Sequence, residues 1–109
     1  MLILFMLLAD DTRWIKGTLA ADKHGVPCSI MEGVKFSILG ALLRLEIQFQ
    51  IDIKPLVVRL ENETGESLGY WNDKDETKYY HVRKLLEGML INDGMVKLPI
   101  ASLRFRKKR

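Results

Sequence analysis

The feature that most constrains the fold of this chain is an apolar stripe with helical spacing in its C-terminal third. Its members recur three or four residues apart, as on one face of an α-helix: Tyr79, Val82, Leu85, Leu86, Met89 and Leu90. Lys84 and Glu87 lie on the opposite face, and Asn92-Asp93-Gly94 supplies a stop signal. The spacing predicts a helix that begins near Thr77 and packs its apolar face against a core.

Apolar spacing and local chemistry predict further helices. Met1–Leu8 is apolar on every side, which favours a buried first helix or a helix that needs a partner surface. Ser37 has a hydroxyl suited to cap the helix that follows it. A later helix is expected to have Asp52 as its cap, Pro55 in its first turn and Gly65 at its end.

Two regions have the signals of extended structure. Asp22-Lys23-His24-Gly25 has the chemistry of a tight hairpin turn, and short strands at about 17–21 and 26–30 are expected to flank it. Strict alternation of apolar and polar residues favours a short strand or extended segment at 46–51. A further edge strand is expected at 95–99.

Length and composition fit one domain. With 109 residues, 48% of them apolar, the chain is long enough for one core and too short for two. We therefore expect an α+β fold, a compact helix-rich single domain of residues 1–103 with about four helices and a small β-hairpin. The apolar runs are far shorter than the roughly 20 residues that span a bilayer, so no membrane span is expected. The single cysteine, Cys28, favours a cytoplasmic location.

The net charge of +3 belongs to the C-terminal tail, residues 104–109, and not to the domain. The tail carries five of the seventeen positive charges, which leaves twelve positive against fourteen negative charges in residues 1–103. A mildly acidic body repels a polyanion, so nucleic-acid binding is the weaker alternative and depends on the tail, helped by Lys97. The candidate residues for it are Arg104, Arg106, Lys107, Lys108 and Arg109.

No combination of residues points strongly to catalysis, to a metal or to a cofactor, and none of these is expected. His24, His81 and Cys28 lack the spacing of a zinc site, and the acids that follow Asp73 lack the spacing of a calcium loop. The most concrete enzyme hypothesis is a Cys-His hydrolase, with Cys28 as nucleophile and His81 as base. Asp73 or Asn72 would orient the imidazole. Against it, Cys28 lies in the expected hairpin and not at a helix start, where the dipole would lower its pKa.

Trp71-Asn72-Asp73 stands shortly before the last predicted helix, and its residue types suit a structural loop. Trp71 is expected to pack its indole into the core, while Asn72 and Asp73 are expected to bond backbone groups of that loop. The same side chains are candidates for contact with a partner. The full set of partner-binding candidates is Trp14, Trp71, Asn72, Asp73 and His81.

Four short motifs occur in a fixed order over about residues 5–91: Trp14-x-x-Gly17, Asp22-x-x-Gly25, Leu39-Gly40-Ala41-Leu42 and Trp71-Asn72-Asp73. In this order they resemble a family of small bacterial and phage proteins known only as a domain of unknown function. The resemblance implies a central helix at the Leu-Gly-Ala-Leu motif and a final helix after Trp-Asn-Asp, and it implies no activity. Many members of that family carry a cysteine just before the Leu-Gly-Ala segment, where this chain has Ser37 nearby.

These observations favour a small non-enzymatic accessory or phage-derived module that binds another protein. Met1–Leu8 is the candidate surface for a homo-oligomer, because an all-apolar helix in a small protein needs to be covered. Nucleic-acid binding through the tail and a Cys-His hydrolase remain as alternatives.

Overall fold

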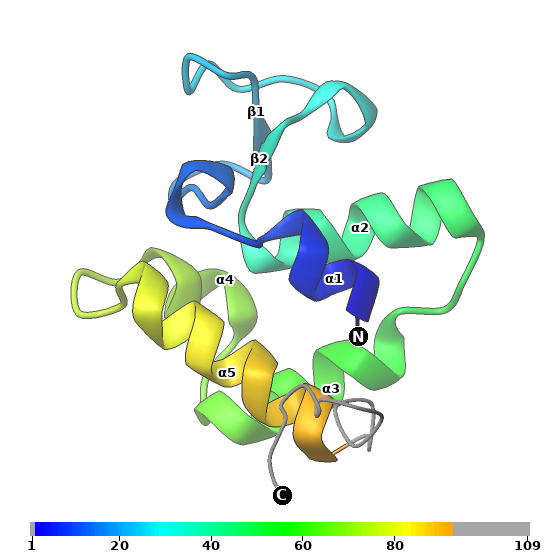
Figure 1. The fold of residues 1–109 in the computed structure, drawn as a ribbon, viewed down its shortest axis with the longest axis vertical. Helices are drawn as coiled ribbons and strands as arrows, with labels where there is room; N and C mark the ends of the chain where they lie inside the picture. Colours follow the sequence, from blue (N-terminus) through cyan, green and yellow to red (C-terminus); the bar gives the residue numbers. More distant parts are fainter. Residues whose placement is uncertain (1, 93–109) are drawn as a thin grey trace, which may run out of the picture.

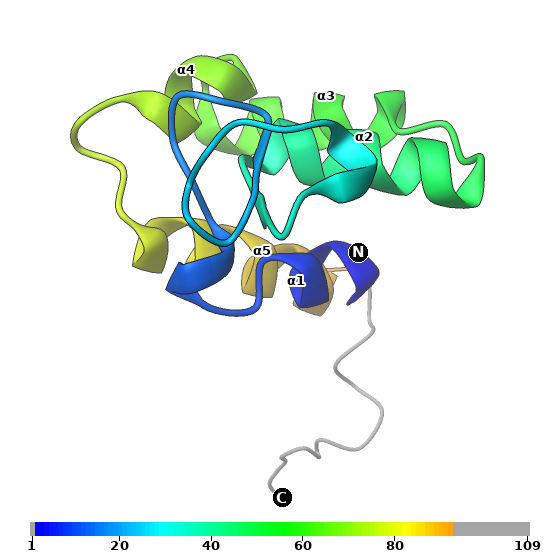
Figure 2. The same cartoon turned by 90° about the horizontal axis from the view of Figure 1, so that it is seen from above.

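The computed structural model describes residues 2–92, with the side chains of residues 2–90. Helices, two 3-10 turns and two short strands follow one another along it: α1 (Leu2–Leu7), η1 (Asp11–Arg13), β1 (Ala20–Ala21), η2 (Ile30–Glu32), β2 (Lys35–Phe36), α2 (Ile38–Phe49), α3 (Lys54–Thr64), α4 (Leu68–Asp73) and α5 (Tyr79–Asn92). This confirms the helix-rich α+β class (Figure 1). In the perpendicular view, α1 and α5 form one layer and α2, α3 and α4 form the other (Figure 2).

Both layers contribute to one apolar core. Its buried members are Leu4, Leu8, Ala20, Phe36, Ile38, Ala41, Leu42, Leu45, Ile53, Leu60, Leu68, Val82, Leu86 and Met89. The stripe that predicted the last helix therefore faces the core, as expected, although α5 begins at Tyr79 and not at Thr77. The first helix is also part of this core, because Leu4 and Leu8 are fully buried.

The N-terminal helix is held against α5 by side chains of α5. The Tyr79 hydroxyl donates to the backbone oxygen of Leu8 at 2.6 Å, and Arg83 donates to the backbone oxygen of Ala9 at 3.0 Å. Burial raises the pKa of Tyr79, so its hydroxyl keeps the proton that it donates. The guanidinium of Arg83 also lies 5.2 Å from the centre of the Phe5 ring.

The expected turn at residues 22–25 forms, but the strand that pairs with β1 is a different one. Gly25 has a φ of +83°, and the Asp22 carboxylate accepts from the backbone N–H groups of His24 and Val26 at 2.8 and 3.0 Å. The two-stranded sheet nevertheless joins β1 to β2, with Ala20 opposite Phe36. The 26–30 segment contributes only an isolated bridge, so the expectation of a strand there was wrong. Burial explains the choice, because Phe36 is 2% exposed whereas Val26 is 55% exposed.

The expected strand at 46–51 is also wrong, because α2 continues through Phe49. Among the apolar residues of that alternation, Leu45 is 3% exposed, whereas Ile47 and Ile51 are 52% and 42% exposed. The apolar residues therefore do not share one covered face, and no neighbouring strand pairs with them. The segment instead continues α2, whose buried residues include Leu42 and Leu45.

Helix ends follow the predicted local chemistry. The Ser37 hydroxyl accepts from the N–H of Gly40 at 3.0 Å and caps α2. The N-cap of α3 is Ile53 and not Asp52 as expected, although Asp52 accepts from the N–H of Lys54 at 3.0 Å; Pro55 lies in the first turn of α3 as expected. Gly65 ends α3 in the left-handed conformation with a φ of +75°. The expected strand at 95–99 and the tail at 104–109 lie outside the described residues.

Candidate docking site

Trp71, Asn72 and Asp73 lie in a helix and not in the loop that was expected. They form the last turn of α4, whose start is capped by the Ser67 hydroxyl, which accepts from the N–H of Tyr70 at 3.4 Å. A helix of six residues that contains Gly69 leaves little periodic signal in a sequence. The last turn of α4 faces the N-terminal segment and the start of α2.

Asn72 joins these three parts of the chain and is 0% exposed. Its side-chain oxygen accepts from the indole N–H of Trp14 at 2.7 Å and from the backbone N–H of Ile38 at 3.0 Å. Its amide group donates to the backbone oxygen of Ile15 at 3.1 Å and to the Asp73 carboxylate at 2.8 Å. An asparagine side chain has two donor hydrogens and two acceptor lone pairs, so all four are used inside the protein.

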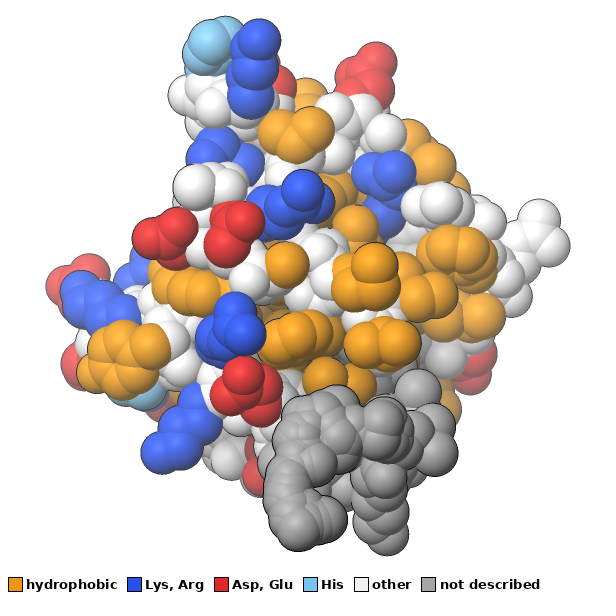
Figure 3. All heavy atoms as spheres, in the orientation of Figure 1, with side chains coloured by type: hydrophobic (Ala, Val, Ile, Leu, Met, Phe, Trp, Pro, Cys, Tyr) orange, Lys and Arg blue, Asp and Glu red, His pale blue; other side chains and the backbone are white. Residues whose placement is uncertain are grey.

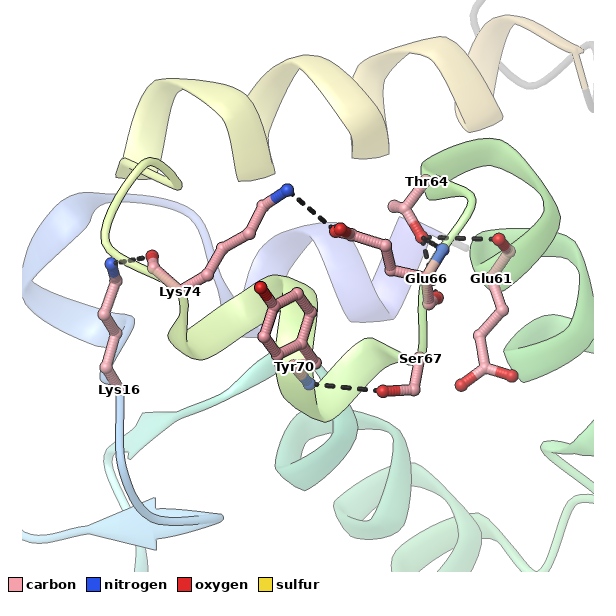
Figure 4. A network of polar contacts seen from close by, with 7 residues as sticks. All are labelled: Lys16, Glu61, Thr64, Glu66, Ser67, Tyr70 and Lys74. Carbon is pink, nitrogen blue, oxygen red and sulfur yellow. Dashed lines mark hydrogen bonds and ion pairs between the residues drawn. The ribbon is translucent and has the colours of Figure 1, made fainter.

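The adjacent carboxylate extends this connection. Asp73 accepts from the backbone N–H of Gly17 at 3.0 Å, and Lys16 donates to the backbone oxygen of Lys74 at 2.6 Å. Figure 4 shows Lys16 and Lys74 with the Lys74–Glu66 ion pair, whose N–O distance is 2.8 Å. The Glu66 carboxylate raises the pKa of Lys74. Of the predicted partner-binding residues, the structure thus brings together Trp14, Asn72 and Asp73, whose hydrogen bonds link distant segments of the chain. The backbone groups that Asn72 and Asp73 bond lie in those distant segments and not in the local loop that was expected.

The other two predicted partner-binding residues lie elsewhere. Trp71 and His81 line a hollow of about 390 Å³ between α3, α4 and α5. Trp71 also packs against the core, as expected. His81 accepts at Nδ1 from the backbone N–H of Lys78 at 2.9 Å and so satisfies a backbone donor just before α5 begins.

Cys28 and His81 are not a nucleophile and its base in this geometry. Cys28 lies shortly after the turn at 22–25, where its N–H donates to the backbone oxygen of Ala20. His81 lies at the start of α5. Burial raises the pKa of the Cys28 thiol, and the carboxylates of Asp22 and Glu32 raise it further. Within residues 2–92 no hydrogen bond joins the two side chains. The geometry therefore gives the hydrolase hypothesis no support.

Exposed apolar side chains gather on another part of the surface, between α1 and α2. Ile3, Met6 and Phe49 are 46%, 60% and 46% exposed, and they line a hollow of about 270 Å³. Leu7 and the buried Leu45 also line it. Figure 3 shows apolar side chains gathered over α1 and α2, with blue basic side chains bordering them on the side of the strands.

A second hollow of about 400 Å³ continues from the first and is bordered by cations. The two hollows share Leu7, Arg13 and Arg44, and the second adds Lys23 and Lys35. No carboxylate lines either hollow among the described residues, and within that part of the chain none of the four cations forms an ion pair. We call the two joined hollows the α1–α2 groove.

Two of the four groove cations, Lys35 and Arg44, are held by backbone oxygens, and Arg44 also lies over an aromatic ring. Lys35 donates to the backbone oxygen of Thr12 at 2.8 Å. Arg44 donates to the backbone oxygens of Ile30 and Gly33 at 3.4 and 3.5 Å, and its guanidinium lies 5.8 Å from the centre of the Phe36 ring. These partners are neutral, so the positive charge is not cancelled locally.

Apart from Met1–Leu8, the sequence pattern did not single out the groove. Arg13, Lys23, Lys35 and Arg44 are scattered over η1, the hairpin, β2 and α2, and only the fold brings them together. The one available signal was the apolar excess of the alternating segment that contains Phe49, which exceeds what a single buried helix face needs.

No protein family, curated protein or solved structure matches the chain. The described residues hold no group of three or more His, Cys, Asp or Glu side chains arranged to bind a metal ion. Among the helices described, none has the length and apolar character needed to cross a membrane.

Proposed function

We propose that this chain is a small non-enzymatic protein-binding module, and that its partner docks in the α1–α2 groove. The observation that carries the proposal is the exposure of Ile3, Met6 and Phe49 around one concave surface. Large apolar side chains that rim a hollow are typical of surfaces that receive an anchor side chain from a partner. A cytoplasmic accessory role in a bacterium or phage is part of the same proposal. It rests on the order of the four short motifs and on the single cysteine.

The exposed apolar side chains of the groove supply part of the free energy of binding. When a partner covers Ile3, Met6 and Phe49, the burial of each exposed half contributes roughly 1 kcal/mol per side chain. The contribution of a partner's own anchor adds to this, and it is opposed by the entropy of association. α1 is suited to present the surface, because Leu4 and Leu8 fix it in the core while Met6 points away from it.

The test is a site-specific photo-crosslink in cells of the native host. A photoreactive amino acid replaces Met6 in one variant and Val58, which is 52% exposed on α3, in a control variant. We expect a discrete protein adduct from the Met6 position and none from the Val58 position. Adduct patterns that are the same from both positions, or no adduct from Met6, would contradict the proposal.

A further inference from the structure

Resting on the proposed function, we infer that the partner of the α1–α2 groove is an acidic amphipathic peptide segment, with a large apolar anchor next to Asp or Glu side chains. The inference comes from the two ends of the groove. One end is lined by Ile3, Met6 and Phe49, and the other by Lys23 and Lys35. Arg13 and Arg44 border both hollows, so the surface changes from apolar to cationic between two adjacent hollows.

The cationic end of the groove has no carboxylate among its described lining residues. Asp10 and Asp22, whose carboxylates interact electrostatically with Arg13 and Lys23, do not line the groove. Asp10 is turned toward Thr12, from whose N–H and hydroxyl it accepts. Four cations without a carboxylate among them favour an anionic group, which they attract from a distance and orient on contact.

The apolar end determines that the ligand is amphipathic. A purely anionic ligand leaves Ile3, Met6 and Phe49 in water and gains nothing from them, whereas an adjacent apolar side chain covers them. The apolar side chains surround a hollow, which suits a protruding anchor better than the flat surface of a bilayer. A nucleic acid offers phosphates for the cations but no aliphatic anchor for the hollow.

A second copy of the chain is a poor occupant of the same groove. A two-fold contact brings the same patch of both copies together, so the cations Arg13 and Arg44 of one copy would face those of the other. Like charges placed together in an interface oppose association. The homo-oligomer expected from Met1–Leu8 is therefore the disfavoured alternative, and light scattering in the test below detects it.

The experiment selects peptides from a randomised 12-residue phage library against the full-length protein. The most enriched peptide is then synthesised with a fluorescent label, and its affinity is measured by anisotropy. We expect the enriched peptides to carry Asp or Glu beside a Leu, Ile, Met, Phe or Trp residue. We also expect the affinity of the labelled peptide to fall as salt rises, because exposed charges are screened.

Matched variants locate the binding on the groove. The double variant Arg13→Glu/Lys23→Glu reverses two exposed groove cations with no side-chain hydrogen bond among the described residues, and is expected to weaken peptide binding about tenfold or more. The control Lys78→Glu/Lys84→Glu makes the same change of net charge at and near the start of α5 and is expected to leave the affinity within about twofold. Met6→Ser should also weaken binding. Circular dichroism melts establish that all variants are folded.

The outcomes separate this inference from the proposed function. Peptides without acidic residues, or binding that Met6→Ser weakens and Arg13→Glu/Lys23→Glu does not, would overturn the acidic partner and leave a protein-docking groove in place. If no peptide is enriched, the acidic partner is also overturned, and the Met6 crosslink decides the proposed function independently. Tighter binding to phosphatidylserine vesicles or to a DNA duplex, lost in the same double variant, would overturn the peptide class. If light scattering shows a dimer that Met6→Ser abolishes, the groove is assigned to a second copy of the chain, and the inference of an acidic peptide partner is overturned.

Discussion

Replacing Asn72 with alanine should cost a large part of the stability of this domain. The substitution removes four hydrogen bonds at a side chain that is 0% exposed. The N–H of Ile38 is left without a partner in a fully buried position, while Trp14 and Ile15 are half-buried and regain part of their bonding from water. A buried polar group without a partner costs about 1–3 kcal/mol, so the total loss should be about 2–4 kcal/mol.

That loss is large because a domain of this length has a free energy of unfolding of only roughly 5–15 kcal/mol. Urea denaturation followed by tryptophan fluorescence measures it, and Trp14 reports on the lost bond directly. We expect the urea midpoint to fall by roughly 1–2 M. Asn62→Ala, at an exposed position on α3, is the matched control and should change the free energy of unfolding by less than about 0.5 kcal/mol. A loss below about 1 kcal/mol for Asn72→Ala would refute the reasoning, since it would mean that water or local repacking replaces the buried bonds.

Two further predictions follow from other contacts. Gly40→Ala should destabilise the protein by about 1–3 kcal/mol or more, because a Cβ at this position would lie 1.8 Å from the backbone oxygen of Leu19. The control is Gly69→Ala on α4, where a Cβ meets nothing within 4 Å. In the same urea titration, the control should be neutral or slightly stabilising. Cys28 should react with iodoacetamide more slowly than free glutathione at pH 8, and its rate should rise with pH along a curve displaced to higher pH, because its raised pKa leaves less thiolate at any given pH.

Both predictions have clear contrary results. Equal urea midpoints for Gly40→Ala and Gly69→Ala would show that the backbone at Leu19 moves away from α2 at no cost. Alkylation of Cys28 at the rate of a free thiol would show that the burial that raises its pKa is not maintained in solution.

The parts of the fold that follow from short-range chemistry were predictable from the sequence. Ser37, Pro55 and Gly65 act on backbone groups within a few residues of themselves, so their roles as cap, first-turn residue and stop can be inferred without the rest of the molecule. The stripe on α5 is long enough for its period to be unambiguous. The same reasoning identified the turn that begins at Asp22, because its carboxylate bonds the turn's own N–H groups.

The C-terminal part of α2 was misassigned because its apolar residues do not all serve the core. Leu45 is buried, but Phe49 is on the surface and lines the α1–α2 groove. Inference from periodicity assumes that apolar residues are placed to be covered by the chain itself. Where a surface is kept apolar for another purpose, that assumption fails and a helix acquires the pattern of a strand.

The candidate site was predictable only in part, because its geometry depends on contacts between distant segments. Trp14, Asn72 and Asp73 were three of the five partner-binding candidates, yet the backbone partners of Asn72 and Asp73, such as Ile38, belong to other elements. The groove cations are separated in the chain by many residues, and no local rule groups them.

The bonds of Asn72 also have a consequence for how long the native state lasts. They join residues 34, 57 and 58 positions apart in the chain, so they form only after α2, α4 and the N-terminal segment have been brought together. Closing loops of this size costs entropy before any bond repays it, which places such contacts late in folding. Interactions that are absent from the folding transition state leave the folding rate almost unchanged and slow unfolding instead. We therefore expect Asn72 to contribute to the lifetime of the folded domain more than to the rate of its folding.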